Sequence, residues 1–153
     1  MTLRSVASPI TGPVRLQMTP RLARGDRLKG AWWPYSDDIT LELGPLLTAL
    51  TSRVGPARGV MLSRSQWASS PLSWSPANNS RLRVSWYGPH EPDIAIVITM
   101  GGKRVDLLLI PSSASSEQAD LAMNLASREG NALTGTDTLI AAGVRPAAEL
   151  LAN

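Results

Sequence analysis

The chain has 153 residues and a formal net charge of +3, which fits one globular domain of ordinary size. It contains no cysteine, which excludes disulfides, thiolate catalysis and cysteine-ligated metal centres, and its single histidine, His90, excludes a site with several histidine ligands. The N-terminus lacks the apolar core of a signal peptide, and no apolar run is long enough to span a membrane. We therefore expect a cytoplasmic protein with no metal or cofactor.

Residues 1–13 show no hydrophobic period and predict a flexible N-terminal lead-in, so that residues 14–153 form a single domain. Alternating or continuous apolar residues predict six strands. These are expected over residues 14–18, 27–33, 58–63, 81–87, 94–100 and 103–110. Gly101-Gly102 predicts a tight hairpin between the last two strands. Residues 66–80 predict a long loop.

Pro34 ends the second strand, and Ser36, Asp37 and Asp38 after it are good helix N-caps. The sequence predicts one helical turn over 37–43 and then a main helix that begins at Pro45. A second helix is expected after Pro111, and a short helix after Gly130-Asn131. The predicted fold is α+β, with a mainly antiparallel sheet of about five or six strands and two or three helices packed on one face.

The stretch from Gly30 to Ile39, with Glu42-Leu43 and Leu46-Leu47 after it, resembles a family of small uncharacterised bacterial proteins. That family shows a G-A-W-W-P-x-S-x-D-L block that runs into E-L-x-x-L, a later tryptophan similar to Trp67, and a leucine-rich strand that ends in proline. The family more often has arginine where this chain has Tyr35. The resemblance covers residues 14 to 127 and implies a domain of unknown function.

The first candidate site is the turn after the second strand. An exposed aromatic residue beside carboxylates could bind a cationic or planar ligand. The alternative is that the polar residues cap a helix and that the tryptophans fill the core. Adjacent Trp32 and Trp33 must point to opposite faces of the sheet. The candidate binding residues are Trp32, Trp33, Tyr35, Asp37, Asp38 and Trp67.

A second candidate is His90-Glu91-Pro92-Asp93, where a histidine and two carboxylates could bind a metal or transfer protons. The alternative is a solvated hairpin loop. A third is a nucleic-acid surface, because no acidic residue lies between Glu42 and Glu91, while arginines are interleaved with tryptophans there. The alternative is an ordinary exposed sheet face. Its candidate residues are Arg58, Arg64, Arg81, Arg83 and Trp86.

The leading functional hypothesis is a non-enzymatic binding or interaction module, because aromatic residues cluster near polar loops and no catalytic set is present. Its partner could be another protein or a second copy of the chain. The alternative is a weakly basic RNA- or DNA-binding domain. An enzyme that uses Asp37, Asp38 and His90 is the third hypothesis.

Overall fold

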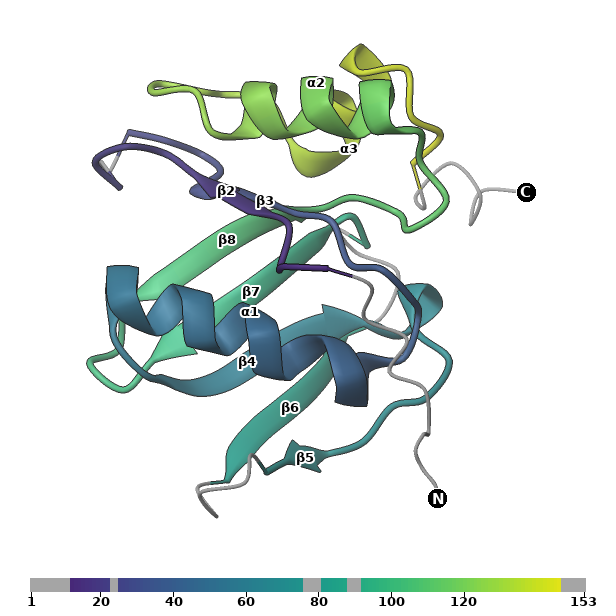
Figure 1. Ribbon diagram of the computed structural model, residues 1–153. Coiled ribbons are helices and arrows are strands. Elements are labelled where there is room, and N and C mark those ends of the chain that lie inside the picture. The colour runs from purple at the N-terminus through teal and green to yellow at the C-terminus, as the bar shows by residue number, and fades with distance from the viewer. Residues whose placement is uncertain (1–11, 23–24, 76–80, 88–91, 147–153) are drawn as a thin grey trace.

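The computed structural model describes residues 12–22, 25–75, 81–87 and 92–146. Seven strands in this part of the chain form one sheet, in the order β2-β3-β8-β7-β4-β6-β5 (Figure 1). Their bounds are β2 (Leu16–Met18), β3 (Gly30–Trp32), β4 (Ala57–Ser63), β5 (Ser73–Trp74), β6 (Leu82–Tyr87), β7 (Ile94–Thr99) and β8 (Arg104–Leu109). The predicted lead-in, residues 1–13, lies almost entirely outside the described residues.

The sheet is mixed, so the prediction of a mainly antiparallel sheet of five or six strands was too simple. β3 pairs with β8 and β4 pairs with β6 in parallel, and the other four neighbouring pairs are antiparallel. The added strand is β5, inside the predicted loop over 66–80, where it pairs with β6. Both parallel pairs join strands that are not consecutive in the chain, because a parallel connection needs a crossover. The hairpin of β7 and β8 is formed as the two glycines predicted.

Helices cover both faces of the sheet, whereas the sequence predicted one. α1 (Ile39–Val54) packs on one face, and α2 (Ser116–Ala126) with α3 (Gly135–Ala141) packs on the other (Figure 1). The central strands are nearly all apolar, so each has a buried side on both faces: Leu107 and Leu109 of β8 face α1, and Leu108 faces α2. A sheet that is buried on both sides has continuous apolar strands of this kind. In the described residues, no helix is both long and apolar enough to cross a membrane.

α1 is one continuous helix, although the sequence predicted a break before Pro45. Asp38 is its N-cap, and its side chain accepts a hydrogen bond from the backbone N–H of Thr40 at 3.1 Å. Pro45 lies inside the helix and removes one backbone hydrogen bond. The buried face formed by Leu43, Leu46 and Leu50 continues past it, and burial of that face holds the helix together.

Candidate functional site

The tryptophans of the Trp-Trp-Pro turn, residues 32–38, face opposite sides of the sheet, as the strand alternation predicted. Trp32 is 1% exposed and stacks on Trp67 in the core under α1, with ring centroids 5.6 Å apart. Trp33 is 9% exposed and belongs to the core under α2. Its Nε1–H donates to the carbonyl oxygen of Pro111 at 3.0 Å. Both rings are therefore structural, and neither offers an open face to solvent.

The cation beside these aromatic residues comes from the chain itself. The guanidinium carbon of Arg15 lies 3.5 Å from the ring centroid of Trp33 and 3.8 Å from that of Tyr35. Arg15 also donates to the carbonyl oxygens of Trp33 and Pro34, each at 2.9 Å. Burial lowers the pKa of Arg15, while Tyr35 and Glu42 oppose that shift. The aromatic residues predicted to bind a cationic ligand, Trp33 and Tyr35, thus already bind Arg15. No sequence motif indicates this role for Arg15.

We expect Arg15→Lys to lower the free energy of unfolding by about 1–2 kcal/mol, because an ammonium cannot stack between two rings and donate in a planar fork. The measurement is urea unfolding of the variant and of wild type. Arg27→Lys is the control, since the Arg27 side chain is exposed, and it should stay within about 0.5 kcal/mol of wild type. Equal unfolding midpoints for Arg15→Lys and wild type would show that the stacking of Arg15 between Trp33 and Tyr35 contributes nothing to stability.

A buried carboxylate holds the turn in its shape. Glu42 is 3% exposed; its Oε1 accepts from the backbone N–H of Tyr35 at 3.1 Å, and its Oε2 accepts from the Ser36 hydroxyl at 2.7 Å. Asp37 is exposed, but its backbone carbonyl accepts from the N–H of Ala68 at 2.9 Å. That bond ties the segment of Trp67 to the turn. Asp38 caps α1. The side chains of Glu42 and Asp38 are therefore both engaged in hydrogen bonds that hold the turn and the helix.

The turn lies at the end of the sheet where the connections after β3 and β8 lead to opposite faces. β3 and β8 are parallel neighbours; the chain leaves β3 toward α1 on one face and leaves β8 toward α2 on the other. The carboxyl ends of two such strands leave a crevice between their loops, and ligands of α/β sheets bind in crevices of this kind. β4 runs in the same direction, because it is antiparallel to β7, which is antiparallel to β8. The loops after β3, β8 and β4 therefore meet at one end of the sheet.

A cavity of about 330 Å³ lies at this end, and we call it the switch-point cavity. Apolar groups and hydrogen-bonding groups share its walls, and among the residues that the structure describes no aspartate or glutamate lines it. The lining residues are Pro34 and Ser36 after β3, Gln66 and Trp67 after β4, Leu109, Ile110, Pro111, Ser112 and Ser113 from the end of β8 onward, and Arg145 after α3.

Trp67 brings an unused donor to this cavity. Its side chain is 8% exposed, and its Nε1–H has no hydrogen-bond partner while exposing less than 1 Å² to solvent. The indole nitrogens of Trp33, Trp74 and Trp86, by contrast, donate to the backbone carbonyls of Pro111, Thr40 and Pro71. A buried donor without a partner costs about 1–3 kcal/mol, so an acceptor supplied from outside the chain would recover that energy.

The structure thus separates the predicted binding residues. Trp67 lines the cavity, Trp32 supports it from behind, Trp33 and Tyr35 hold Arg15, and Asp38 caps a helix. Sequence reasoning missed the serines after Pro111, which read as helix caps, and Arg145. Pro111 indicated in the sequence where the strand before it ends. No residue pattern around Arg145 indicated a binding site.

The predicted nucleic-acid residues do not form one surface. Arg58 and Arg83 line a second cavity, of about 380 Å³, on the sheet face away from α1, together with Met61, Ser85 and Ile98. Trp86 packs toward α1, and its Nε1–H donates to the carbonyl oxygen of Pro71 at 2.7 Å. The remaining two, Arg64 in η1 (Arg64–Gln66) and Arg81, are exposed. The cavity lined by Arg58 and Arg83 and the ring of Trp86, the tryptophan among the predicted nucleic-acid residues, therefore lie on opposite faces of the sheet.

His90 and Glu91, which carried the metal and acid–base hypothesis, lie outside the described residues. Asp93 from the same stretch is buried, and its Oδ2 accepts from the Thr136 hydroxyl at 2.9 Å. Among the residues that the structure describes, no group of three or more histidine, cysteine, aspartate or glutamate side chains could hold a metal ion.

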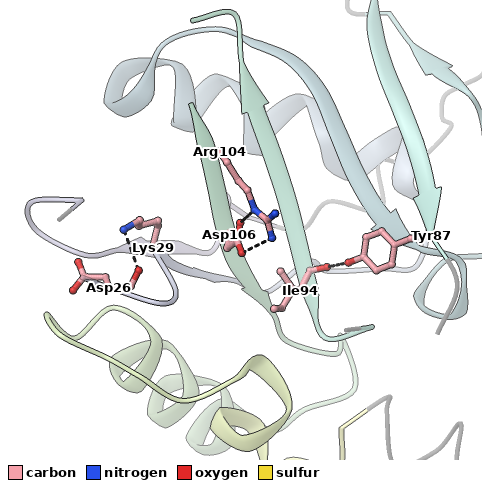
Figure 2. Close-up of polar contacts among 6 residues, drawn as sticks. All are labelled: Asp26, Lys29, Tyr87, Ile94, Arg104 and Asp106. Carbon is pink, nitrogen blue, oxygen red and sulfur yellow. Dashed lines mark hydrogen bonds and ion pairs between the residues drawn. The ribbon is translucent and has the colours of Figure 1, made fainter. Parts of the chain in front are cut away.

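On the sheet face away from α1 and in the loop before β3, the polar contacts drawn in Figure 2 join residues of the chain to one another. Arg104 and Asp106 of β8 form an ion pair at 2.6 Å, and the Tyr87 hydroxyl donates to the carbonyl oxygen of Ile94. β6 and β7 both pair with β4 and not with each other, so the Tyr87 bond links two strands that the sheet leaves apart. Lys29 donates to the carbonyl oxygen of Asp26 at 3.0 Å. These contacts stabilise strands and loops, and their residues do not line the switch-point cavity.

The fold and the site together define a small mixed α+β domain with a cavity at the carboxyl ends of two parallel strands. Residues 15–126 match the Family of unknown function (DUF5994), and because the match covers most of the chain, the protein belongs to this family. The match includes the turn, Trp67 and β8, while Arg145 lies beyond it. No match was found among curated proteins or among solved structures.

Proposed function

We propose that the protein is a non-enzymatic binding module that takes a small molecule into the switch-point cavity. The observation that carries the proposal is that Trp67, a residue that lines this cavity, has a buried Nε1–H without a hydrogen-bond partner. Protein interiors rarely leave such a donor unpaired. A cavity of about 330 Å³ is at the lower end of the range for ligand pockets, which is about 300–1,000 Å³.

The position of the cavity supports the same function. It lies where the chain diverges after β3 and β8, which is the place where open α/β sheets bind ligands. Its floor is rigid, because Trp67 stacks on Trp32 and the turn beside it is fixed by Glu42. A preformed pocket binds with less loss of conformational entropy than a mobile loop does.

The test is a screen of small organic acids, amides and alcohols against ¹⁵N-labelled protein, followed through the indole N–H signals of tryptophan. Binding should shift the Trp67 indole signal and the backbone N–H signals of Ser112 and Ser113. The indole of Trp74 is the internal control, because it donates to the carbonyl oxygen of Thr40 and does not line the cavity. If no compound at millimolar concentration moves the Trp67 signal, the proposal is wrong.

We expect Trp67→Phe to weaken every compound found in this screen by about tenfold or more, because the lost hydrogen bond is buried. The same variant should unfold within about 1 kcal/mol of wild type, since removing an unpaired buried donor offsets the smaller ring. Isothermal titration calorimetry and urea unfolding measure the two effects. Trp74→Phe, which removes an indole that already has a partner, should leave binding unchanged.

A further inference from the structure

We infer that the ligand of the switch-point cavity is a small organic carboxylate. Its anion is held by the indole N–H of Trp67 and the guanidinium of Arg145, and its apolar part lies against Pro34, Leu109 and Ile110. This inference rests on the proposed function, because it names the chemical class that the same cavity selects.

The side chains that line the cavity include two that can only donate hydrogen bonds, beside serine hydroxyls that can donate or accept. The Ser36 hydroxyl is already engaged, since it donates to Glu42 at 2.7 Å and accepts from the N–H of Asp38 at 3.2 Å. The amide of Gln66 donates to the carbonyl oxygen of Pro92 at 3.4 Å. The indole of Trp67 and the guanidinium of Arg145 are hydrogen-bond donors only. A ligand that binds both groups must therefore supply acceptors.

The charge of the lining favours an anion. Among the described residues that line the cavity, Arg145 is the charged one, and it is exposed. No carboxylate belongs to this described part of the wall, so an anion meets no like charge from it. A hydrogen bond to a charged group is roughly twice as strong as one between neutral groups.

A carboxylate fits this set of donors better than a phosphate does. Phosphate sites commonly use several backbone N–H groups at the start of a helix, together with more than one cation. In α2, the helix that follows the cavity wall, a capping box already engages two of these N–H groups: Ser115 accepts from the N–H of Gln118 at 3.2 Å, and Gln118 accepts from the N–H of Ser115 at 3.1 Å. One arginine with one indole N–H matches a single negative charge.

The cavity also limits the size and polarity of the acid. Its volume corresponds to about ten molecules of liquid water, which leaves room for one ring or a short branched chain. The walls beside the donors are proline, leucine, isoleucine and the indole ring.

The test compares phenylacetate with phenylacetamide, which have nearly the same shape and differ in charge. Titrations are followed through the Trp67 indole signal in wild type, in Arg145→Gln and in Arg128→Gln. Arg128 is exposed and does not line the cavity, so its variant controls for the change in net charge. We expect phenylacetate to bind at least tenfold more tightly than phenylacetamide, and Arg145→Gln to weaken phenylacetate alone by about three- to tenfold.

Three outcomes are distinguishable. Tighter binding of the acid that depends on Arg145 and not on Arg128 supports the inference. Equal binding of acid and amide, unchanged in Arg145→Gln, overturns the carboxylate inference and leaves the binding function standing. If neither compound moves the Trp67 signal and the wider screen also fails, the proposed function is overturned, and the inference fails with it.

Discussion

Replacing Gly30 by alanine is expected to lower the free energy of unfolding by about 3 kcal/mol or more. Gly30 has φ +154°, in the range that favours glycine, and it pairs with Met18 of the neighbouring strand β2. A Cβ atom at this position would lie 2.8 Å from the Cα of Met18 and would collide with the carbonyl oxygen of Gln17. These are backbone atoms, so no side chain can rotate away, and strain adds to overpacking.

Urea unfolding of Gly30→Ala measures this effect, and Gly44→Ala provides the matched control. Gly44 lies within α1, and an added Cβ would meet the ring of Trp74 at 3.6 Å, an ordinary contact. Because alanine favours a helix more than glycine does, Gly44→Ala should stabilise the protein by up to about 1 kcal/mol. A Gly30→Ala variant as stable as wild type would mean that β2 does not approach β3 this closely.

Replacing Glu42 by alanine should cost about 2–4 kcal/mol. The substitution leaves the buried N–H of Tyr35 and the hydroxyl of Ser36 without their acceptor, and it also opens a small void beside the turn. Glu42→Gln keeps the shape and one acceptor oxygen, so its cost should be smaller, about 1 kcal/mol.

Chemical unfolding of the two Glu42 variants, set beside Asp37→Ala, separates the buried carboxylate from the general effect of removing an acid. Asp37 lies in the same turn, but its side chain is exposed, so its variant should stay within about 0.5 kcal/mol of wild type. Should Asp37→Ala destabilise the protein as much as Glu42→Ala does, the loss would come from charge and not from the hydrogen bonds described here.

Features that depend on neighbours in the chain could be predicted from the sequence. The alternation through β3 placed Trp32 and Trp33 on opposite faces, and Gly101-Gly102 marked the hairpin of β7 and β8. Features that depend on distant partners could not. No local pattern shows that β4 pairs with β6 in parallel, because the two have the same alternation whichever strand lies beside them.

The candidate site follows the same division. Trp67 was among the predicted binding residues because it is an aromatic residue in a polar loop, and it does line the cavity. Its supporting groups come from elsewhere: Arg15, from before β2, occupies the faces of Trp33 and Tyr35, and Arg145, after α3, reaches the cavity mouth. Nothing in a single sequence states which arginine meets which ring, so the sequence alone leaves an exposed aromatic surface as a candidate site.

The pairing of β3 with β8 also bears on how the chain folds. Gly30 pairs with Leu107, so a loop of about half the chain has to close when these two strands meet. Closing so long a loop is entropically costly, and proteins dominated by such pairings fold in milliseconds to seconds. The hairpin of β7 and β8 is local and can form early, whereas the turn with Trp32 joins the sheet only afterwards. The cavity, built on that late contact, is therefore expected to be completed near the end of folding.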